Sequence, residues 1–451
     1  MSEITTKSDR KKDREDLSQA QKAGKKSNTV KSWYECLGPG LITGAADDDP
    51  SGIGTYSANG AQFGYALLWL VPLALPLMIA VQEMCGRIGV ITGQGLAAVL
   101  KQHYPKWLLW SCVVMLIGAN IFNVYADLNV MAASANMLFG TPFWLALTVI
   151  ALLITALQVF VPYHHYVKIL KWLCLSLLGY VIVALLPGVK NDWGAIVKAF
   201  FIPHMDTKPE TILTVVAFLG TTISPYLFFW QASETVEEEV AEGHADPEGS
   251  RKDRVSEQEI RNIRADTVVG MIASQAVAFF IIVATAGSLH QHGMTEINTA
   301  QDAAKALLPL GPSAYWIFAL SMIGTGLLAI PTLTGSAAYA VAETAGWRYG
   351  LYRRFSRAKA FYITIAVVLM IGYAMNFMQV ISPVKALIYS AALNGMIAPP
   401  LIVVLLFICN NKKIVGLRTN GFWSNALGWL TVAGMGAAAA YLVYAMVTQK
   451  T

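Results

Sequence analysis

Three consecutive aspartates, Asp47, Asp48 and Asp49, stand in the sequence AADDDPSGIG, inside a stretch that is otherwise apolar. A carboxylate at the centre of a bilayer costs roughly 2.5–3.5 kcal/mol on insertion scales. The neighbouring apolar stretches carry no lysine or arginine at a matching depth, which argues against a buried ion pair. The three acids therefore predict a cation site or a water-filled cavity.

The three aspartates cannot all be ligands of one ion, because successive residues of a helix point about 100° apart. Asp49 directly precedes Pro50, at which a helix must unwind, so we expect Asp49 to contact the cation directly. We expect Asp47 and Asp48 to line the approach to it.

The composition predicts an all-α integral membrane protein. The 451 residues are 55% hydrophobic and only 14% charged, and the mean hydropathy is +0.50. Residues 1–35 are polar and lack an apolar core, so we expect a disordered cytoplasmic tail and no cleaved signal peptide. The five cysteines have no paired spacing, which argues against a disulfide framework.

Apolar runs long enough to cross a bilayer predict eleven helices. They lie near residues 37–62, 66–90, 107–139, 143–161, 167–187, 211–233, 264–288, 313–343, 360–377, 384–409 and 422–447.

The distribution of basic residues predicts the orientation of these helices. With the N-terminus inside, all but six of the 33 Lys and Arg lie on the cytoplasmic side; the exceptions are Lys190, Lys198, Lys208, Lys305, Lys385 and Lys450. This asymmetry follows the positive-inside rule, so the net charge of +5 implies no nucleic-acid partner. We expect a multi-pass plasma-membrane protein with an extracellular C-terminus and a solvated cytoplasmic loop at 234–262.

Two of the eleven helices are interrupted near their middles. Pro50 breaks the first, and Pro225 breaks the sixth within VVAFLGTTISPYLFFWQASE. The two breaks are five helices apart, which predicts two halves of opposite orientation, about 36–190 and 205–410. Such inverted repeats place the transport site at the breaks. Residues 411–451 then add an eleventh helix to the ten-helix core of 36–410.

Two motifs carry a resemblance to a known family. GPGLITGAADDDPSG resembles the first-helix motif of the Nramp family of divalent-metal transporters, and QEMCGRIGVITGQGL (82–96) resembles the second-helix signature of that family. The resemblance implies a LeuT-type fold, a 5+5 inverted repeat with discontinuous first and sixth helices. It also implies transport by alternating access.

The resemblance implies a metal site with positions next to it. The metal positions are Asp49, Ala46, Gly52, Thr221, Ser224 and Asn394, and Thr222, Tyr226, Gln231 and Asp127 are expected to support them or to line the access path. The metal-binding aspartate of the family falls on Asp49, its asparagine on Gly52 and its first-helix carbonyl on Ala46. The sixth-helix positions fall on Thr221, Thr222, Ser224 and Tyr226, of which Ser224 replaces a methionine. Gln231 and Tyr226 replace two histidines. In the third helix Asp127 remains while Val130 replaces a second acid, and the tenth-helix glutamine falls on Asn394.

These replacements change the expected chemistry. A thioether favours transition metals, so Ser224 in its place leaves an all-oxygen cavity, and Gly52 adds volume for an ion that keeps part of its water. The pattern resembles the Nramp-related magnesium transporters, which carry Mg²⁺ and Mn²⁺. The missing histidines and Val130 argue against proton coupling, and a membrane potential of 100 mV supplies about 4.6 kcal/mol per divalent ion.

Other interpretations of these residues stay open. The hydroxyls of Thr221 and Thr222 could instead bond to backbone carbonyls within their own helix. Asn394 could form a hydrogen bond to another helix, and Gln231 could simply pack between helices. We expect His164 and His165 to lie at the membrane interface and not to bind metal. We expect no cofactor, since the metal ion is the transported substrate, and no obligatory protein partner besides the lipid bilayer.

Other functions also stay open. One is a proton-coupled Mn²⁺/Fe²⁺ importer, against which the lost Met, Asn and His count. Another is an amino-acid transporter, against which the aspartates count because they repel a substrate carboxylate. A third, from a different class, is a non-transporting membrane sensor or receptor. No GxSxG, HExxH or Walker-type sequence appears, so an enzyme is not expected.

Overall fold

The computed structural model describes residues 43–44, 46–161, 175–189, 191–246, 251, 255–378 and 381–448. This part of the chain is almost entirely helical, which confirms the predicted all-α class. The predicted tail at 1–35, the Gly-Pro pair before the aspartates, and His164 and His165 lie outside the described residues.

Most predicted spans correspond to long helices, and short helices that were not predicted lie between them. In chain order they are α3 (Pro50–Phe63), α4 (Leu70–Thr92), α5 (Leu96–His103), α6 (Lys106–Phe139), α7 (Phe143–Phe160), η1 (Leu175–Leu177), α9 (Leu178–Leu185), α10 (Trp193–Phe201), α11 (Pro209–Thr222), α12 (Pro225–Glu242), α13 (Glu257–Ser288), η2 (His290–His292), α14 (Ala300–Ala304), η3 (Lys305–Ser313), α15 (Ala314–Ala345), α16 (Lys359–Met375), η4 (Asn376–Met378), α17 (Pro383–Asn410), α18 (Lys412–Val415) and α19 (Phe422–Thr448).

Nine of the spans in the described part of the chain are long and apolar enough to cross a membrane. The prediction of eleven includes two more. The first span is interrupted at Asp48 and Asp49, and the fifth is described only from Leu175 onward, as η1 and α9. The chain is therefore a multi-pass membrane protein.

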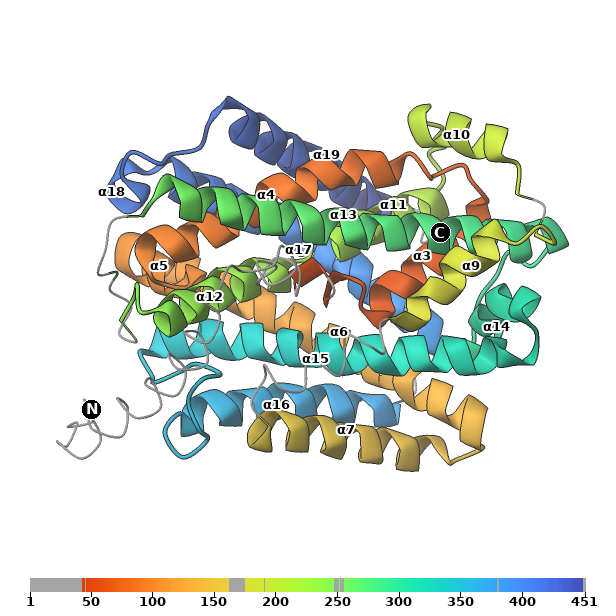
Figure 1. Cartoon of the computed structure of the whole chain (residues 1–451), viewed down its shortest axis with the longest axis horizontal. Coiled ribbons are helices and arrows are strands. Elements are labelled where there is room, and N and C mark those ends of the chain that lie inside the picture. Colours follow the sequence, from red (N-terminus) through yellow and green to blue (C-terminus); the bar gives the residue numbers. More distant parts are fainter. Residues whose placement is uncertain are drawn as a thin grey trace.

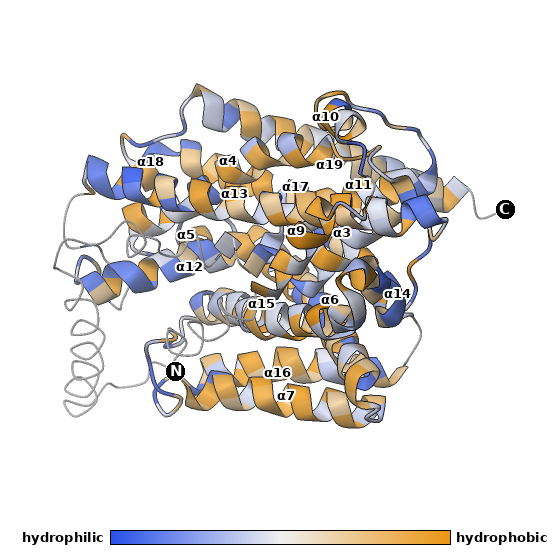
Figure 2. Cartoon of the chain, turned by 45° about the vertical axis from the view of Figure 1, so that its right-hand side comes forward, coloured by the Kyte–Doolittle hydropathy of each residue, from blue (hydrophilic) through white to orange (hydrophobic). Residues whose placement is uncertain are grey.

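The long helices run side by side between two ends of the bundle (Figure 1). One end carries α5 and α18, and the other carries α10 and α14. Hydrophilic residues gather around α18 and α14, while the helix middles are apolar (Figure 2). Both features are those of a bundle that spans a bilayer.

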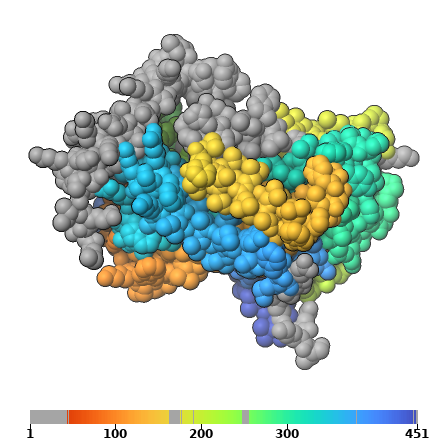
Figure 3. Space-filling view, turned by 90° about the horizontal axis from the view of Figure 1, so that it is seen from below, coloured from red at the N-terminus to blue at the C-terminus, as the bar shows by residue number. Residues whose placement is uncertain are grey.

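One long face of the bundle consists of α7 and α16, which lie side by side (Figures 1 and 3). The side chains of Val149 and Leu152 on α7 and of Ile363 and Val367 on α16 are exposed. Exposed apolar side chains in the middle of spanning helices are expected to contact lipid.

Both predicted breaks are present, and the prolines stand at the start of the second half-helix in each case. Pro50 is the first residue of α3, after an extended Asp49, and Pro225 is the first residue of α12, after an extended Ser224. Proline suits the first helical position because its missing N–H has no partner there anyway. The chain therefore ends one half-helix and begins another at each site.

Glycines let the helices around these breaks approach closely. A Cβ at Gly220 of α11 would lie 2.0 Å from the carbonyl oxygen of Ala391 and 2.3 Å from the nitrogen of Gly395, both on α17. A Cβ at Gly44 would lie 2.4 Å from the carbonyl oxygen of Gly270 on α13. Backbone contact at these two crossings positions the broken first and sixth spans against their neighbours.

Candidate metal site

The two breaks meet at the side chain of Tyr226, the second residue of α12. Its hydroxyl donates to the carbonyl oxygen of Ala46 at 2.9 Å and lies 3.4 Å from Asp49 Oδ2. All three side chains are buried. The carbonyl and the carboxylate that we predicted as metal ligands therefore converge on one point.

Asp49 also has a structural role as the N-cap of α3. Its Oδ1 accepts a hydrogen bond from the backbone nitrogen of Gly52 at 2.7 Å and one from Ser51 Oγ at 2.8 Å. A carboxylate at a helix N-terminus satisfies free N–H groups and interacts favourably with the helix dipole. The cap occupies Oδ1 and leaves Oδ2 directed toward Tyr226 and Ala46.

Gly52 of α3 faces α11 directly. A Cβ at Gly52 would lie 3.2 Å from Thr221 Oγ1 and 3.3 Å from the carbonyl oxygen of Asp47. Thr221 is buried, and its side chain interacts with that of Tyr56 on α3. Even a Cβ at Gly52 would be crowded, so the glycine lets α3 approach α11 closely, and the space that we expected from the missing asparagine side chain is already filled by these neighbours.

Ser224 and Thr222 both bond to carbonyl groups of the last turns of α11. Ser224 Oγ lies 2.8 Å from the carbonyl oxygen of Gly220 and 2.7 Å from that of Thr221. Thr222 Oγ1 donates to the carbonyl oxygen of Phe218 at 2.9 Å. The two hydroxyls thus donate their hydrogen atoms to carbonyl groups where α11 ends. Only the lone pairs of their oxygen atoms remain for a cation.

Asn394 makes the interhelical bond that was the alternative to a ligand role. Its side chain exchanges two hydrogen bonds with that of Asn123 on α6, at 3.1 and 3.2 Å. One turn further along α6 stands Asp127, which is fully buried and interacts electrostatically with Asp49. Neither oxygen of Asp127 has a hydrogen-bond partner within the described residues.

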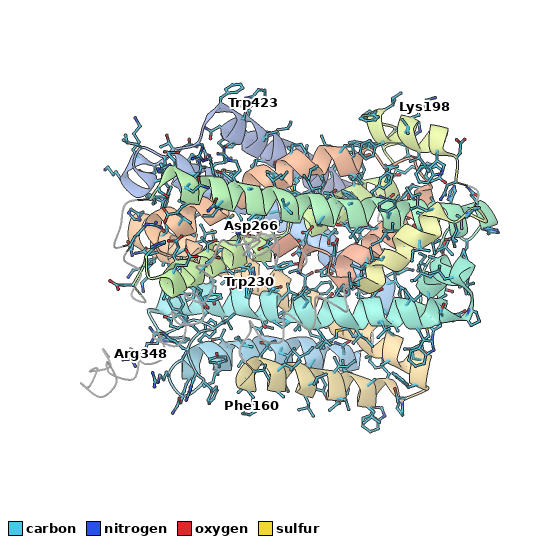
Figure 4. All side chains as sticks on the ribbon, viewed as in Figure 1. Phe160, Lys198, Trp230, Asp266, Arg348 and Trp423 are labelled. Carbon is cyan, nitrogen blue, oxygen red and sulfur yellow. The ribbon has the colours of Figure 1, made fainter. Side chains whose placement is uncertain are left out.

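Gln231 lies away from Asp49, beside the start of the described first span. Its Oε1 accepts from Thr43 Oγ1 at 2.5 Å, and a Cβ at Gly86 of α4 would lie 3.4 Å from its Nε2. Trp230, labelled in Figure 4, packs between α12 and α15, where its ring lies 6.2 Å from that of Tyr339. These contacts hold α12 against the first span, α4 and α15.

Asp47 and Asp48 share a partner that the sequence analysis missed. Ser274 Oγ of α13 donates to Asp47 Oδ2 at 2.6 Å and lies 3.4 Å from Asp48 Oδ1. The signal for Ser274 was a polar pair, Ser274 and Gln275, inside an apolar span. The signal for Asn123 was its place on one helical face with Asp127.

A second group of side chains suited to a metal lies outside this cavity, at the α5 end. Glu239, His244 and Glu259 offer ligand atoms within 4.8 Å of one another. The guanidinium of Arg251 already binds two of them, Glu239 at 2.7 Å and Glu259 at 2.5 Å. This group is therefore an ion-pair network. The prediction of a solvated loop at 234–262 is wrong in part, because α12 continues to Glu242, α13 begins at Glu257, and Val236 and Val240 are buried.

Comparison with known proteins supports the motif resemblance. The family model described as natural resistance-associated macrophage protein-like (Nramp) matches residues 40–445. The chain is 24% identical over 418 residues to a protein from Brucella suis named divalent metal cation transporter MntH, covering 91% of this chain and 88% of the relative. It is 25% identical over 409 residues to a protein of the same name from Klebsiella pneumoniae, covering 88% and 91%.

Solved structures with the same fold include transporters of two kinds. A manganese transporter of Eremococcus coleocola has a TM-score of 0.72 at 16% identity, covering 94% of this chain and 88% of that one. Mhp1, a nucleobase-cation-symport-1 family transporter, has a TM-score of 0.53 at 13% identity, covering 91% of each chain. The predicted LeuT-type fold is confirmed, and the chain belongs to the Nramp family of membrane transporters, not to an enzyme family.

Proposed function

We propose that this protein takes up hydrated divalent metal ions, Mg²⁺ and Mn²⁺, through the cavity between the two breaks by alternating access. The observation that supports this most directly is the convergence of Ala46 O and Asp49 Oδ2 on one point. Asp49→Ala should therefore abolish uptake.

The choice of ion follows from the ligand atoms. The predicted metal ligands Asp49, Ala46, Thr221, Ser224 and Asn394 offer oxygen or amide groups, and Gly52 offers none. Hard cations prefer oxygen, and Mg²⁺ is usually held through one or two carboxylates and several waters. Asp49 Oδ2, whose one contact within the described residues is the hydroxyl of Tyr226 at 3.4 Å, suits such a hydrated ion.

The energy for uptake is proposed to come from the membrane potential and the ion gradient, without proton coupling. Tyr226 and Gln231 stand where the resemblance places histidines, and both are engaged in hydrogen bonds that involve Ala46 and Thr43. About 2.3 kcal/mol per elementary charge per 100 mV is available to an inward-moving cation.

A second candidate is a proton-coupled manganese importer. The names of the relatives, divalent metal cation transporter and manganese transporter, favour it. So does Asp127, a buried carboxylate without a hydrogen-bond partner within the described residues.

Uptake into sealed liposomes decides between these candidates. The vesicles hold a Mg²⁺-sensitive dye or a Mn²⁺-sensitive dye together with a pH dye, and an inside-negative potential is imposed. We expect Mg²⁺ and Mn²⁺ to enter without internal acidification and entry to stop in Asp49→Ala. Asp192→Ala is the matched control, because Asp192 caps α10 in the same way, through a bond from the nitrogen of Ala195, outside the cavity.

The outcomes separate the alternatives. Entry of Mn²⁺ alone with acidification supports the second candidate. Equal uptake by wild type and Asp49→Ala contradicts both candidates. If the purified protein binds metal but no liposome preparation shows uptake, the result supports a non-transporting sensor.

The orientation and location are also proposed. The basic α18 end would face the cytoplasm and the α10 and α14 end the exterior, in a plasma membrane. This arrangement follows from the positive-inside rule.

A further inference from the structure

We propose that Glu239, His244 and Glu259 form a second metal site, outside the cavity between the two breaks, that binds one divalent transition-metal ion such as Mn²⁺ or Zn²⁺. The site lies at the α5 end of the bundle, where α12 ends and α13 begins. Ion binding there does not depend on the proposed function, whereas its effect on uptake does.

The first observation is the spacing of the ligand atoms. His244 Nδ1 lies 3.4 Å from Glu239 Oε2 and 3.4 Å from Glu259 Oε1, and the three residues offer ligand atoms within 4.8 Å of one another. Atoms at these separations surround a point that lies at most about 2.4 Å from each, close to the roughly 2.0–2.2 Å between Zn²⁺ and nitrogen or carboxylate ligands. An ion at that point would contact all three side chains.

The second observation is the nitrogen of His244 that faces the carboxylates. The side chain as a whole is 38% exposed, but its Nδ1 is shielded from solvent and forms no hydrogen bond within the described residues. Shielded polar atoms in native proteins are almost always paired with protein, water or an ion. The lone pair of a neutral imidazole nitrogen is a common metal ligand, so a bound ion would supply the missing partner.

The local structure holds the three side chains in place. Glu259 is the third residue of α13, and its Oε2 accepts from the backbone nitrogen of Ser256 in a capping box, which leaves Oε1 directed toward His244. Gly243 ends α12 with a φ of +89°, a conformation that favours glycine, and the backbone nitrogen of His244 then donates to the carbonyl oxygen of Glu239 at 2.9 Å. The turn therefore folds His244 back over Glu239.

Arg251 completes the ion-pair network without neutralising it. Its guanidinium binds Glu239 Oε2 at 2.7 Å and Glu259 Oε1 at 2.5 Å, so it brings one positive charge to two carboxylates. Glu242 Oε2 lies 3.7 Å from His244 Nδ1 and adds a third carboxylate to the group. A carboxylate oxygen has lone pairs for both an N–H group and a metal ion. We expect Arg251 to remain bound to the two carboxylates and to orient them toward the ion.

The ligand atoms select the class of ion. Imidazole suits transition metals, whereas Mg²⁺ prefers oxygen ligands and keeps several waters. This site therefore differs from the cavity at Asp49, whose predicted ligands include no histidine. It should hold Mn²⁺ or Zn²⁺ in the presence of excess Mg²⁺.

A bound ion would join the end of α12 to the start of α13. The α12 helix is the second half of the broken sixth span, and alternating access moves one part of such a bundle against the other. We therefore expect the ion to slow uptake. This effect makes the site a regulatory one, through which a transition metal limits transport.

The test detects the histidine ligand directly. Untagged full-length protein in detergent is loaded with Mn²⁺ in excess Mg²⁺, and electron spin echo modulation from a metal-bound imidazole nitrogen is recorded. We expect this modulation in wild type and in Asp49→Ala, because the predicted ligands of the cavity include no histidine. His244→Ala should lose the modulation and should bind one Mn²⁺ fewer per chain.

Two further variants guard against misfolding. Glu259→Gln keeps a residue that suits the capping box and removes the charge, so it should weaken Mn²⁺ binding at this site. A rise of roughly tenfold in the dissociation constant is expected, as for changes in groups that support metal ligands. His103→Ala removes an exposed histidine at the same end of the bundle and should keep the modulation. An unchanged Tm of the metal-free variants shows that they are folded.

The outcomes also separate this inference from the proposed function. Absence of the modulation in wild type, or its persistence in His244→Ala, overturns the site even if Asp49-dependent uptake is observed. Modulation that depends on His244 in a protein without uptake leaves the site standing and overturns the transport proposal. In liposomes, Zn²⁺ on both sides should slow Mg²⁺ uptake by wild type more than that by His244→Ala; equal inhibition of the two overturns the regulatory effect.

Discussion

The hydroxyl of Tyr226 donates to the carbonyl oxygen of Ala46 at 2.9 Å and so joins the start of α12 to the last helical turn before Asp49. The bond connects two chain breaks that lie 180 residues apart in the sequence. Freed carbonyls at helix breaks are tolerated in a membrane only where they line a cavity or find a partner. Tyr226 supplies that partner, and we expect it to hold Ala46 O near Asp49 Oδ2.

Replacement of Tyr226 by phenylalanine should weaken cation binding. The variant removes the hydroxyl and keeps the ring, so Ala46 O and Asp49 Oδ2 lose their common contact. The expected rise in the KM for Mg²⁺ is roughly fivefold, from a net hydrogen-bond contribution of about 1 kcal/mol. Liposome uptake measures it.

The control for this variant is Tyr373→Phe, which removes a hydroxyl that pairs with Thr148 between α16 and α7, at 2.9 Å. Its uptake should match wild type. A lower KM in Tyr226→Phe would show instead that the hydroxyl occupies the position of the ion.

Replacement of Ser224 by methionine should shift the preference toward soft metals. The variant places a thioether at the start of α12, and thioethers favour transition metals over Mg²⁺. We expect the ratio of Cd²⁺ to Mg²⁺ uptake to rise about tenfold, which corresponds to roughly 1.4 kcal/mol.

Ser224→Leu is the matched control, since leucine fills a similar volume without sulfur and also removes the bonds to the carbonyls of Gly220 and Thr221. An equal shift in both variants would trace the change to lost hydroxyl bonds and not to sulfur.

The helices could be predicted from the sequence because hydropathy and proline each act locally. The predicted span at 107–139 is α6, Lys106–Phe139, and the break before Pro225 is present. Twenty apolar residues suffice to cross a bilayer, and a proline removes an N–H from the helix. Proline alone does not decide a break, because Pro76 and Pro331 lie inside the continuous helices α4 and α15. Membership of the Nramp family was also predicted correctly from the motifs.

The contacts of the candidate site could not be predicted, because they depend on which helices meet. Ser274 reaches Asp47 across 227 residues of sequence, and Asn394 reaches Asn123 across 271. Motif spacing places a residue on its own helix and leaves its partner on another helix unspecified. Ligand roles for Thr222 and Asn394 stay predictions, and the hydrogen bonds of these residues show what a cation must compete with.

Addition of one methyl group at the crossing of α11 and α17 should destabilise the protein. In Gly220→Ala the new Cβ would lie 2.0 Å from the carbonyl oxygen of Ala391, so the two backbones must separate. Overpacking of this kind typically costs about 1–3 kcal/mol. Thermal unfolding in detergent should show a lower Tm and a loss of uptake.

The matched control is Gly434→Ala in α19, where a Cβ meets nothing within 4 Å. Alanine is favoured over glycine in a helix by roughly 0.5–1 kcal/mol, so this variant should raise the Tm slightly. A Tm for Gly220→Ala equal to that of wild type would contradict the close crossing.

The proposed orientation predicts which loops are accessible from outside a cell. Leu417, near α18, is 99% exposed, and Glu296, before α14, is also exposed. In a variant with Cys36→Ser and Cys174→Ser the remaining cysteines, Cys85, Cys112 and Cys409, are buried. A membrane-impermeant maleimide on intact cells should label Glu296→Cys directly and Leu417→Cys only after permeabilisation.

The orientation matters because it fixes the sign of the voltage term in transport. With the α18 end inside, a divalent ion that moves from the α14 end to the α18 end moves toward the negative side, and the membrane potential favours uptake. Labelling of Leu417→Cys in intact cells would show that the α18 end faces the exterior, which is the opposite of the proposed orientation. The same potential would then oppose movement from the α14 end to the α18 end, and the proposed import without proton coupling would require entry from the α18 end.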